Sequence, residues 1–338
     1  MLIRPVRLDD HEPILELAKQ AGIGMLSLPP DSDVLRQKIE HSVKSFSDTL
    51  EWEKEERFLF VMEDDSNGRL VGTTGIVAHV GLNRPFYSYK LSTIVQANRE
   101  LDIYTLQQVL HMVNDYTGVS ELGSLFLTPE YRRDGLGRLL SRCRYMMIAE
   151  FPHFFADTVI AEIRGVNDDK GGAPFYDNLA KNFFNMTFMQ ADYISATMGN
   201  QFITDLMPKY PIYVNLLPKE ARDVIGKPLP ESEAAMRLLA YEGFTYEGYV
   251  DLFDAGPTLQ AEREKIRAVA TSRASTVGEI RDKVELEHQF MISNTRLTDF
   301  TICRDNMQIE ADGRVIITEA TARKLKVNQG DAIRYTSA

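Results

Sequence analysis

The chain has 338 residues, of which 44% are hydrophobic and 26% are charged, as is typical of a soluble globular protein with one large or two ordinary cores. Its 38 basic and 49 acidic residues give a net charge of −11, which argues against nucleic acid or an anionic membrane as the main partner and suits a cationic substrate. Because we see no signal-peptide pattern and no apolar run of roughly 18 residues, we expect a cytoplasmic protein without a membrane span.

The predicted elements alternate between strands and helices, beginning with a strand at residues 2–10 that carries arginine and is followed by aspartate. The next elements are helices over 12–23 and 31–50, a solvated acidic run at 51–56, a hairpin over 58–80, aromatic and turn-rich segments over 85–120, a strand and a helix over 120–150, a strand over 159–163, a helix over 175–184, proline-punctuated sequence over 205–232, a helix over 233–242 and a strand over 244–253.

The pattern changes to short strands and turns from about residue 276. We therefore expect residues 1–273 to form the main domain and residues 274–338 a small β-rich appendage. The two cysteines, Cys143 and Cys303, lie far apart in the sequence and are expected to be reduced and structural.

The most informative motif is Arg132-x-x-Gly135-x-Gly137, which follows an apolar strand. After Gly135, apolar residues recur at helical spacing and predict an amphipathic helix: Leu136, Leu139, Leu140, Cys143 and Met147. Two glycines at a strand-to-helix turn let successive backbone N–H groups converge at the positive end of the helix dipole. The motif therefore predicts a pyrophosphate-binding loop.

The two commonest phosphate loops do not fit this motif. No Gly-Lys-Ser/Thr run is present there, and Leu140 stands where a dinucleotide-binding fingerprint has its third glycine. The loop instead resembles the one by which GNAT-type acyltransferases bind the pyrophosphate of coenzyme A, and the strand at 2–10 resembles the start of such chains. The resemblance implies an α/β (α+β) fold with a central mixed sheet flanked by helices.

Short runs along the chain are similar, in the same order, to those of a single family. They are residues 27–29 (SLP), 85–87 (PFY), 114–118 (NDYTG), 120–122 (SEL), 125–127 (LFL), 161–165 (AEIRG), 206–208 (LMP), 211–213 (PIY), 242–244 (EGF) and 251–259 (DLFDAGPTL). Through these runs the chain resembles the bacterial arginine N-succinyltransferases over nearly its full length.

This resemblance implies transfer of the succinyl group of succinyl-CoA to the α-amine of L-arginine, or of L-ornithine in some relatives. The products would be N2-succinylarginine and CoA, in arginine catabolism. The resemblance also implies a homo- or hetero-oligomer, and no metal is expected.

Donor-binding residues are expected on the strand, the loop and the first turn of the helix. They are Leu125, Phe126, Leu127, Arg132, Arg133, Gly135, Leu136, Gly137 and Arg138. The resemblance places a succinyl-CoA contact at Leu125, whose backbone N–H would suit the oxyanion of the tetrahedral intermediate. Arg164 is expected to bind the succinyl carboxylate; the alternative is a surface arginine in a solvent salt bridge.

An arginine acceptor needs carboxylates for its guanidinium and a base for its α-ammonium. Glu121 and Asp168 are expected to bind this substrate. Glu162 is expected to act on the substrate or as the base, since a carboxylate in an apolar strand is costly unless it is paired. The structural alternative is that Glu162 pairs with a core arginine such as Arg164.

Two substitutions depart from the family pattern. Leu229 stands where relatives carry a histidine that is assigned as the proton donor, and Ala255 replaces a glycine in a turn. Tyr176 is the predicted replacement donor to the departing CoA thiolate, and the alternative is an aromatic packing residue. His111, which we expect on a helix, matches no catalytic position of the family.

Three functions remain open from the sequence. They are an active arginine or ornithine N-succinyltransferase, a GNAT-type transferase with a changed amine acceptor, and a non-catalytic subunit of a hetero-oligomer. The intact CoA loop argues against the third.

Overall fold

A computed structural model describes residues 1–22, 25, 27–47, 55–168, 171–284 and 288–338. Most of the predicted acidic run at 51–56 and the end of the helix predicted over 31–50 lie outside the described residues.

The described residues form fifteen strands in one mixed sheet. The strands are β1 (Leu2–Pro5), β2 (Arg57–Asp64), β3 (Arg69–Val77), β4 (Ser88–Asn98), β5 (Ile103–Val113), β6 (Ser120–Leu127), β7 (Thr158–Glu162), β8 (Ile212–Tyr213), β9 (Thr245–Val250), β10 (Pro257–Glu262), β11 (Arg273–Arg281), β12 (Gln289–Asn294), β13 (Ile302–Ile309), β14 (Val315–Thr318) and β15 (Ala332–Ser337).

Eleven α-helices occur in the same described ranges. They are α1 (His11–Ala21), α2 (Ser32–Ser45), α3 (Leu136–Glu150), α4 (Pro174–Asn178), α5 (Lys181–Phe184), α6 (Phe188–Met198), α7 (Gln201–Leu206), α8 (Lys219–Arg222), α9 (Glu233–Glu242), α10 (Arg267–Thr271) and α11 (Glu319–Leu325).

The strand order is β12-β15-β11-β14-β13-β1-β2-β3-β6-β7-β10-β9-β4-β5-β8. The central neighbours β6 and β7 are parallel, as are β11 and β14, whereas the other pairs are antiparallel. The fold class predicted from the sequence, a mixed sheet flanked by helices with a small β-rich C-terminal unit, is therefore confirmed.

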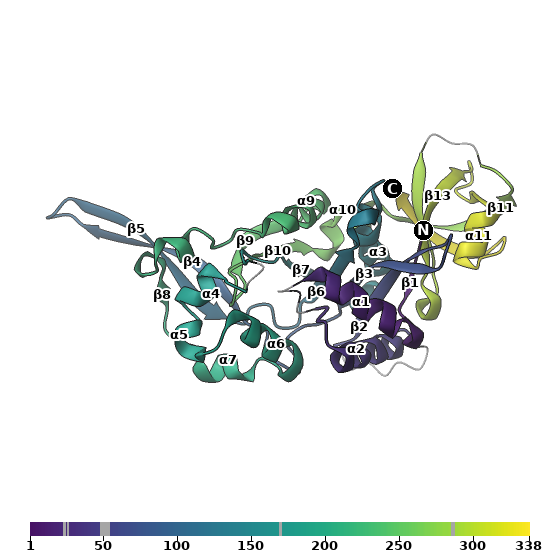
Figure 1. The fold of residues 1–338 in the computed structure, drawn as a ribbon. Helices are drawn as coiled ribbons and strands as arrows, with labels where there is room; N and C mark the ends of the chain where they lie inside the picture. The colour runs from purple at the N-terminus through teal and green to yellow at the C-terminus, as the bar shows by residue number, and fades with distance from the viewer. Residues whose placement is uncertain (23–24, 26, 48–54, 169–170, 285–287) are drawn as a thin grey trace.

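Strand β2 shows how the sheet is covered on both faces. Phe58 and Phe60 pack in the core that contains α3, while Leu59 and Val61 pack in the core that contains α1 and α2. Successive side chains of a strand point to opposite faces, so an uninterrupted apolar run is what a strand buried on both sides requires. Figure 1 shows α1 and α2 together beside β1 and β2, with α3 behind β3.

The five C-terminal strands close on themselves, because β12 pairs with both β15 and β13. The resulting small barrel joins the main sheet where β13 pairs with β1, at Leu2↔Cys303 and Ile3↔Ile302. In Figure 1 the barrel lies at one end of the molecule, beside the N-terminus. Among the described residues, no helix is long and apolar enough to cross a membrane.

At the opposite end, β4 and β5 form a long hairpin that projects away from the body of the molecule (Figure 1). The two strands pair from Ser88↔Val113 to Asn98↔Ile103. The sequence indicated only aromatic and turn-rich segments here, and the expected helix around His111 is wrong, since this residue is in β5. An arm exposed on both faces lacks the one-sided apolar pattern by which strands are recognised.

The other differences concern the region after β7. The helix predicted over 175–184 is broken into α4 and α5, and the sequence did not predict α6, α7 or β10. The helices predicted over 12–23 and 31–50 correspond to α1 and α2 with shifted ends, whereas the predicted helices after Gly135 and over 233–242 agree with α3 and α9.

Candidate active site

The predicted anion-binding loop lies between β6 and α3. Asp134 and Gly135 both adopt left-handed backbone conformations, with φ of 54° and 72°, so the chain turns sharply before the helix. The first-turn N–H groups of α3 have no carbonyl partner four residues earlier in the helix and carry the positive end of its dipole. The loop therefore has the local geometry that the motif predicts.

Two arginines of the motif have different surroundings. Arg132 donates from Nε to the carbonyl of Leu127 (2.9 Å), and its guanidinium carbon lies 5.8 Å from the centre of the Phe126 ring. These contacts fix the loop to the end of β6. Arg133 is exposed beside Asp134, with 3.9 Å between Nε and the carboxylate.

A cavity of about 620 Å³ runs along this loop and the adjoining strands. Eight of the predicted donor-binding residues line it: Leu125, Phe126, Leu127, Arg132, Arg133, Gly135, Leu136 and Gly137. The ninth, Arg138, is outside this lining; its Nη2 donates to the Tyr241 hydroxyl (3.0 Å), and its guanidinium lies 4.5 Å from the centre of that ring.

The cavity exists because the parallel strands β6 and β7 separate. They pair only at Ser120↔Val159 and Glu121↔Ile160, near their N-terminal ends. Beyond Glu121 the edge of β6 faces the cavity, where an extended ligand can take the place of the missing strand. This gap between β6 and β7, here called the wedge, lies along the part of β6 that carries the expected donor-binding residues Leu125, Phe126 and Leu127.

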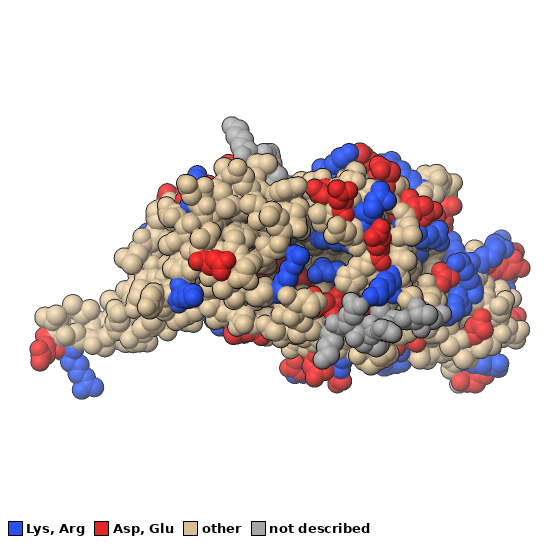
Figure 2. Space-filling model, turned by 90° about the horizontal axis from the view of Figure 1, so that it is seen from below, with Lys and Arg blue, Asp and Glu red and all other residues tan. Residues whose placement is uncertain are grey.

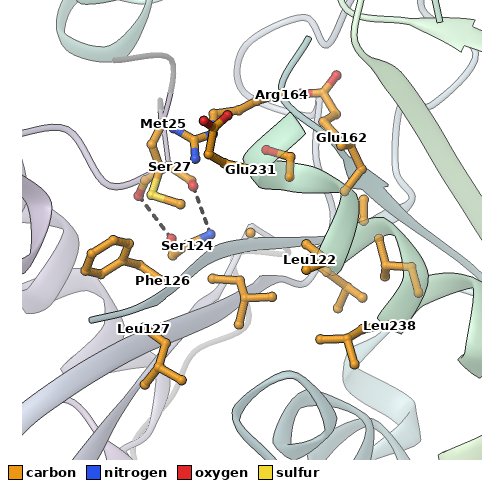
Figure 3. A pocket seen from close by; sticks show the side chains of 18 of the residues that line it. Met25, Ser27, Leu122, Ser124, Phe126, Leu127, Glu162, Arg164, Glu231 and Leu238 are labelled. Atoms are coloured by element: carbon orange, nitrogen blue, oxygen red, sulfur yellow. Dashed lines mark hydrogen bonds between the residues drawn. The ribbon is translucent and has the colours of Figure 1, made fainter. Parts of the chain in front are cut away.

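The wedge contains a distorted segment of β6 at Ser124, whose φ of 53° is left-handed (Figure 3). Ser27 holds this residue in place: its Oγ accepts a hydrogen bond from the Ser124 N–H (2.8 Å), and its carbonyl accepts one from the Ser124 Oγ (3.1 Å). On the other side, the Thr73 hydroxyl donates to the carbonyl of Ser124 (2.8 Å). The register with β3 shifts here, so Ser124 and Leu125 form a bulge.

A second cavity, of about 540 Å³, lies on the other side of the bulge. The two cavities share seven lining residues: Ser27, Glu121, Gly123, Ser124, Glu162, Asp251 and Phe253. A donor in the first cavity and an acceptor in the second would therefore meet at the bulge. Figure 2 shows a hollow in the middle of one face with Lys and Arg side chains around it.

Acidic side chains from three segments gather between the cavities. Burial raises the pKa of Glu162 well above its ordinary value, and the nearby carboxylates of Asp251, Glu121 and Asp254 raise it further. Their effect is opposite to that of a paired arginine, so Glu162 belongs to a buried acidic cluster.

Glu121 and Asp254 are held differently. Burial raises the pKa of Glu121, whereas Arg57 and Lys38 act to lower it. Asp254 accepts hydrogen bonds from the N–H groups of Gly165 (2.7 Å) and Gly256 (2.8 Å), which fix the turn behind the cluster.

Arg164 lines the first cavity and donates from Nη1 to the carbonyl of Ala21 (3.1 Å). Burial lowers its pKa, and the carboxylates of Asp254 and Glu231 partly oppose that shift. In Figure 3 the side chains of Arg164 and Glu231 approach each other above the bulge. Arg164 is thus a half-buried cation that lines the cavity.

Tyr176 lies away from both linings, in an aromatic core with Phe184, Phe188 and Phe253. Its hydroxyl donates to the carbonyl of Met186 (3.3 Å), and burial raises its pKa to about 12. These surroundings fit the alternative in which Tyr176 is an aromatic packing residue.

Asp168 and Leu229 also lie outside both linings. The Asp168 carboxylate accepts a hydrogen bond from the Gly172 N–H (2.8 Å) and closes its own loop. The backbone N–H of Leu229 donates to the carbonyl of Arg164 (2.8 Å), so the position of the family histidine is next to the first cavity.

Sequence reasoning missed Lys38 and Arg57, which line the second cavity, and did not assign Ser27 or Asp251 to the site. Ser27 and Asp251 belong to sequence runs that were typical of the family, so a signal for them was available. No sequence signal marked Lys38, because only the packing of α2 against β2 brings it into the second cavity.

Comparison with known proteins agrees with this geometry. The family described as arginine N-succinyltransferase beta subunit matches residues 1–268, and the one described as its C-terminal domain matches residues 273–337. The chain is similar to arginine N-succinyltransferase subunit beta of Pseudomonas aeruginosa, with 40% identity over 336 residues, covering 99% of this chain and 97% of the relative. It is also similar to arginine N-succinyltransferase of Escherichia coli, with 40% identity over 334 residues, covering 99% and 96%.

Among solved structures, that of subunit AI of the arginine/ornithine succinyltransferase from Pseudomonas aeruginosa is similar to this fold. The TM-score is 0.89 and the identity 34%, covering 99% of this chain and 98% of that one. With both family descriptions matched along nearly the whole chain, the protein belongs to the arginine N-succinyltransferase family.

Proposed function

We infer that the protein transfers the succinyl group of succinyl-CoA to the α-amine of L-arginine, giving N2-succinylarginine and CoA in arginine catabolism. The observation that supports this is the meeting of the two cavities at the Ser124–Leu125 bulge, with an anion-binding loop on one side and the carboxyl cluster on the other. A catabolic enzyme that uses a CoA thioester suits the cytoplasm.

On the donor side, the loop from Arg132 to Gly137 would bind the pyrophosphate, and the pantetheine arm would lie along the free edge of β6. Arg164 is suited to the succinyl carboxylate because it is a half-buried cation in the same cavity. The Leu125 N–H, in the bulge, would stabilise the oxyanion that forms on the thioester carbonyl.

On the acceptor side, the α-ammonium must lose a proton before it can attack. Glu162 is the proposed base, since burial and the neighbouring carboxylates raise its pKa and so make it a stronger proton acceptor than an ordinary carboxylate. The amine nitrogen then forms a bond to the thioester carbon, the C–S bond breaks, and the CoA thiolate leaves and is protonated. Glu121 and Asp251 remain to bind the guanidinium.

Glu162→Gln tests this assignment. It removes the base but keeps the side-chain shape, so we expect kcat to fall by about 10²- to 10⁴-fold, while calorimetric affinity for CoA is unchanged. Asp168→Asn, in an exposed loop, is the matched control and should keep full activity. Thiol release with another amine but not with arginine or ornithine would instead support a changed acceptor.

We also propose that two copies of this chain associate through the β4–β5 hairpin. The hairpin exposes large apolar side chains: Val95, Leu101, Ile103, Tyr104 and Leu106. The accessible surface of 16279 Å² is about 2,300 Å² larger than the roughly 14,000 Å² of a compact monomer of this mass, and this excess is larger than the roughly 800 Å² that each partner buries in a standard interface. A relative is named as a subunit.

Replacing residues 96–105 by Asn-Gly tests the arm, since it joins the paired residues Val95 and Leu106 by a two-residue turn. Light scattering should give a dimer for the parent chain and a monomer for the shortened one. If the shortened chain is still a dimer, the contact between the two copies lies outside the hairpin.

A further inference from the structure

The second cavity is lined by side chains of opposite charge. Lys38 on α2 and Arg57 on β2 form a basic part of the lining, here called the basic wall, and Glu121, Glu162 and Asp251 form an acidic part. A substrate that fills such a cavity needs a cation at one end and an anion at the other. The carboxylates of Glu121, Glu162 and Asp251 can bind the cationic end of the acceptor, but they give no role to Lys38 and Arg57.

Hydrogen bonds through Ser27 place the ammonium of Lys38 near the reaction centre. Lys38 Nζ donates to the Ser27 carbonyl over 3.1 Å, and the Ser124 Oγ donates to the same oxygen over 3.1 Å. Since both atoms are bound to one acceptor, they are separated by less than twice that distance. The ammonium is therefore beside the bulge at which the thioester carbonyl would lie.

The structure of an α-amino acid explains what an ammonium beside the bulge could do. Its amine and its carboxylate are attached to the same carbon, so a cation that binds the carboxylate also fixes the amine. A carboxylate bound to Lys38 would bring the α-amine to the bulge and to Glu162, while the side chain extends toward Glu121 and Asp251. Positioning of this kind contributes to catalysis by lowering the entropic cost of reaching the transition state.

The electrostatic state of Lys38 suits an incoming anion. Burial, with a smaller contribution from the neighbouring Arg57, lowers its pKa to about 7, and Glu121 acts in the opposite direction. A buried ammonium in this state gains from a bound carboxylate, which is both a charge partner and a hydrogen-bond acceptor.

We propose that Lys38 binds the α-carboxylate of the acceptor, so that the site selects free α-amino acids with a cationic side chain over amines that lack the carboxylate. This inference rests on the proposed succinyl transfer and adds the residue that recognises the second charged end of the acceptor. Arg57 strengthens the positive potential of the same wall.

The test compares L-arginine with agmatine, which has the same guanidinium and a primary amine but no carboxylate. The wild-type protein should prefer arginine by at least about 100-fold in kcat/KM, as expected when a buried charged hydrogen bond is lost. Lys38→Met should reduce kcat/KM for arginine by a similar factor and change that for agmatine less than about threefold. Lys44→Met, an exposed lysine on the same helix, is the matched control and should leave both values unchanged.

Equal losses for both acceptors in Lys38→Met would overturn the proposal, because they would indicate a structural role; so would no loss for either. Calorimetric binding of arginine and agmatine without succinyl-CoA gives the same comparison and does not depend on turnover, and a thermal melt reports whether the variant is folded. If the wild-type protein binds arginine through Lys38 but transfers no succinyl group, the proposed function fails and the carboxylate site stands.

Discussion

The guanidinium of Arg304 donates a hydrogen bond of 2.7 Å to the carbonyl of Asp134, and so connects the C-terminal barrel to the CoA loop. Asp134 is one of the two left-handed residues that turn this loop into α3. A Cβ added at Gly135 would lie 3.2 Å from the same guanidinium, which shows how closely β13 approaches the loop. The barrel thus supports the shape of the predicted pyrophosphate site.

Arg304→Met removes this support. A hydrogen bond to a charged donor contributes about 1.5–3 kcal/mol when buried and less when it is half exposed, so we expect KM for succinyl-CoA to rise about 3- to 10-fold. kcat should be unchanged, since the reacting atoms are distant from Arg304. Arg323→Met, an exposed arginine of the barrel that pairs with Glu319, is the control. An unchanged KM would mean that the loop keeps its shape without the barrel.

Gly137→Ala separates ligand binding from folding. An added Cβ would have its nearest neighbour at 3.9 Å, from Leu127, so the protein itself has room for it. Alanine stabilises a helix relative to glycine by up to about 1 kcal/mol, so thermal stability should stay the same or rise. The methyl group would enter the cavity that the loop lines, and we expect the calorimetric Kd for CoA to weaken at least about tenfold. Unchanged affinity would place the pyrophosphate elsewhere.

The backbone geometry of the loop from Arg132 to Gly137 could be predicted because its signal is local. The spacing of Gly135 and Gly137 and the apolar period that follows lie within a short stretch, and the fold needed only to provide the strand before them. The turn at Ala255 is similar: the family resemblance implied a glycine at this position, and the residue adopts a positive φ of 55°. The conformations of this loop and of this turn depend on the local backbone more than on contacts with distant parts of the chain.

The acceptor side could not be predicted in the same way. Nothing in the sequence distinguishes Lys38 from Lys44 on the same helix, because the difference is created by the packing of α2 on β2. Glu162 was predicted, since a carboxylate stands out in an apolar strand, but its neighbour Asp251 comes from a turn far along the chain. Where strands from separate segments meet, the local pattern carries little information.

Tyr176→Phe tests whether this tyrosine is a proton donor or a packing residue. Its hydroxyl donates to a backbone carbonyl within an aromatic core, so its loss should lower the free energy of unfolding by about 1 kcal/mol. We expect kcat to remain within about twofold of wild type. Denaturant unfolding and steady-state rates, measured on the same preparation, make the comparison. A fall in kcat of tenfold or more without a loss of stability would restore the catalytic role.

The low pKa of Lys38 gives a prediction about proton uptake. Two charged groups act on its pKa, Arg57 on β2 and Glu121 on β6. The other charged or titratable groups that line its cavity are His41, Glu55, Arg84, Tyr87, Glu162 and Asp251. In the free protein, burial lowers the pKa of Lys38 to about 7, so at pH 8 most molecules carry a neutral amine. A bound carboxylate favours the ammonium and raises this pKa, so binding must take up a proton.

A suitable ligand is 5-guanidinopentanoate, which has the guanidinium and carboxylate of arginine but no α-amine to titrate. Calorimetry in buffers of different ionisation enthalpy gives the number of protons exchanged on binding. The guanidinium also lowers the pKa of the carboxyl cluster and releases protons, but this release occurs in Lys38→Met as well and cancels in the difference. We expect the wild-type protein to take up about 0.9 proton more than Lys38→Met at pH 8, and only about 0.1 more at pH 6, where Lys38 is already charged. Equal exchange in the two proteins at pH 8 would show that the carboxylate does not bind at Lys38.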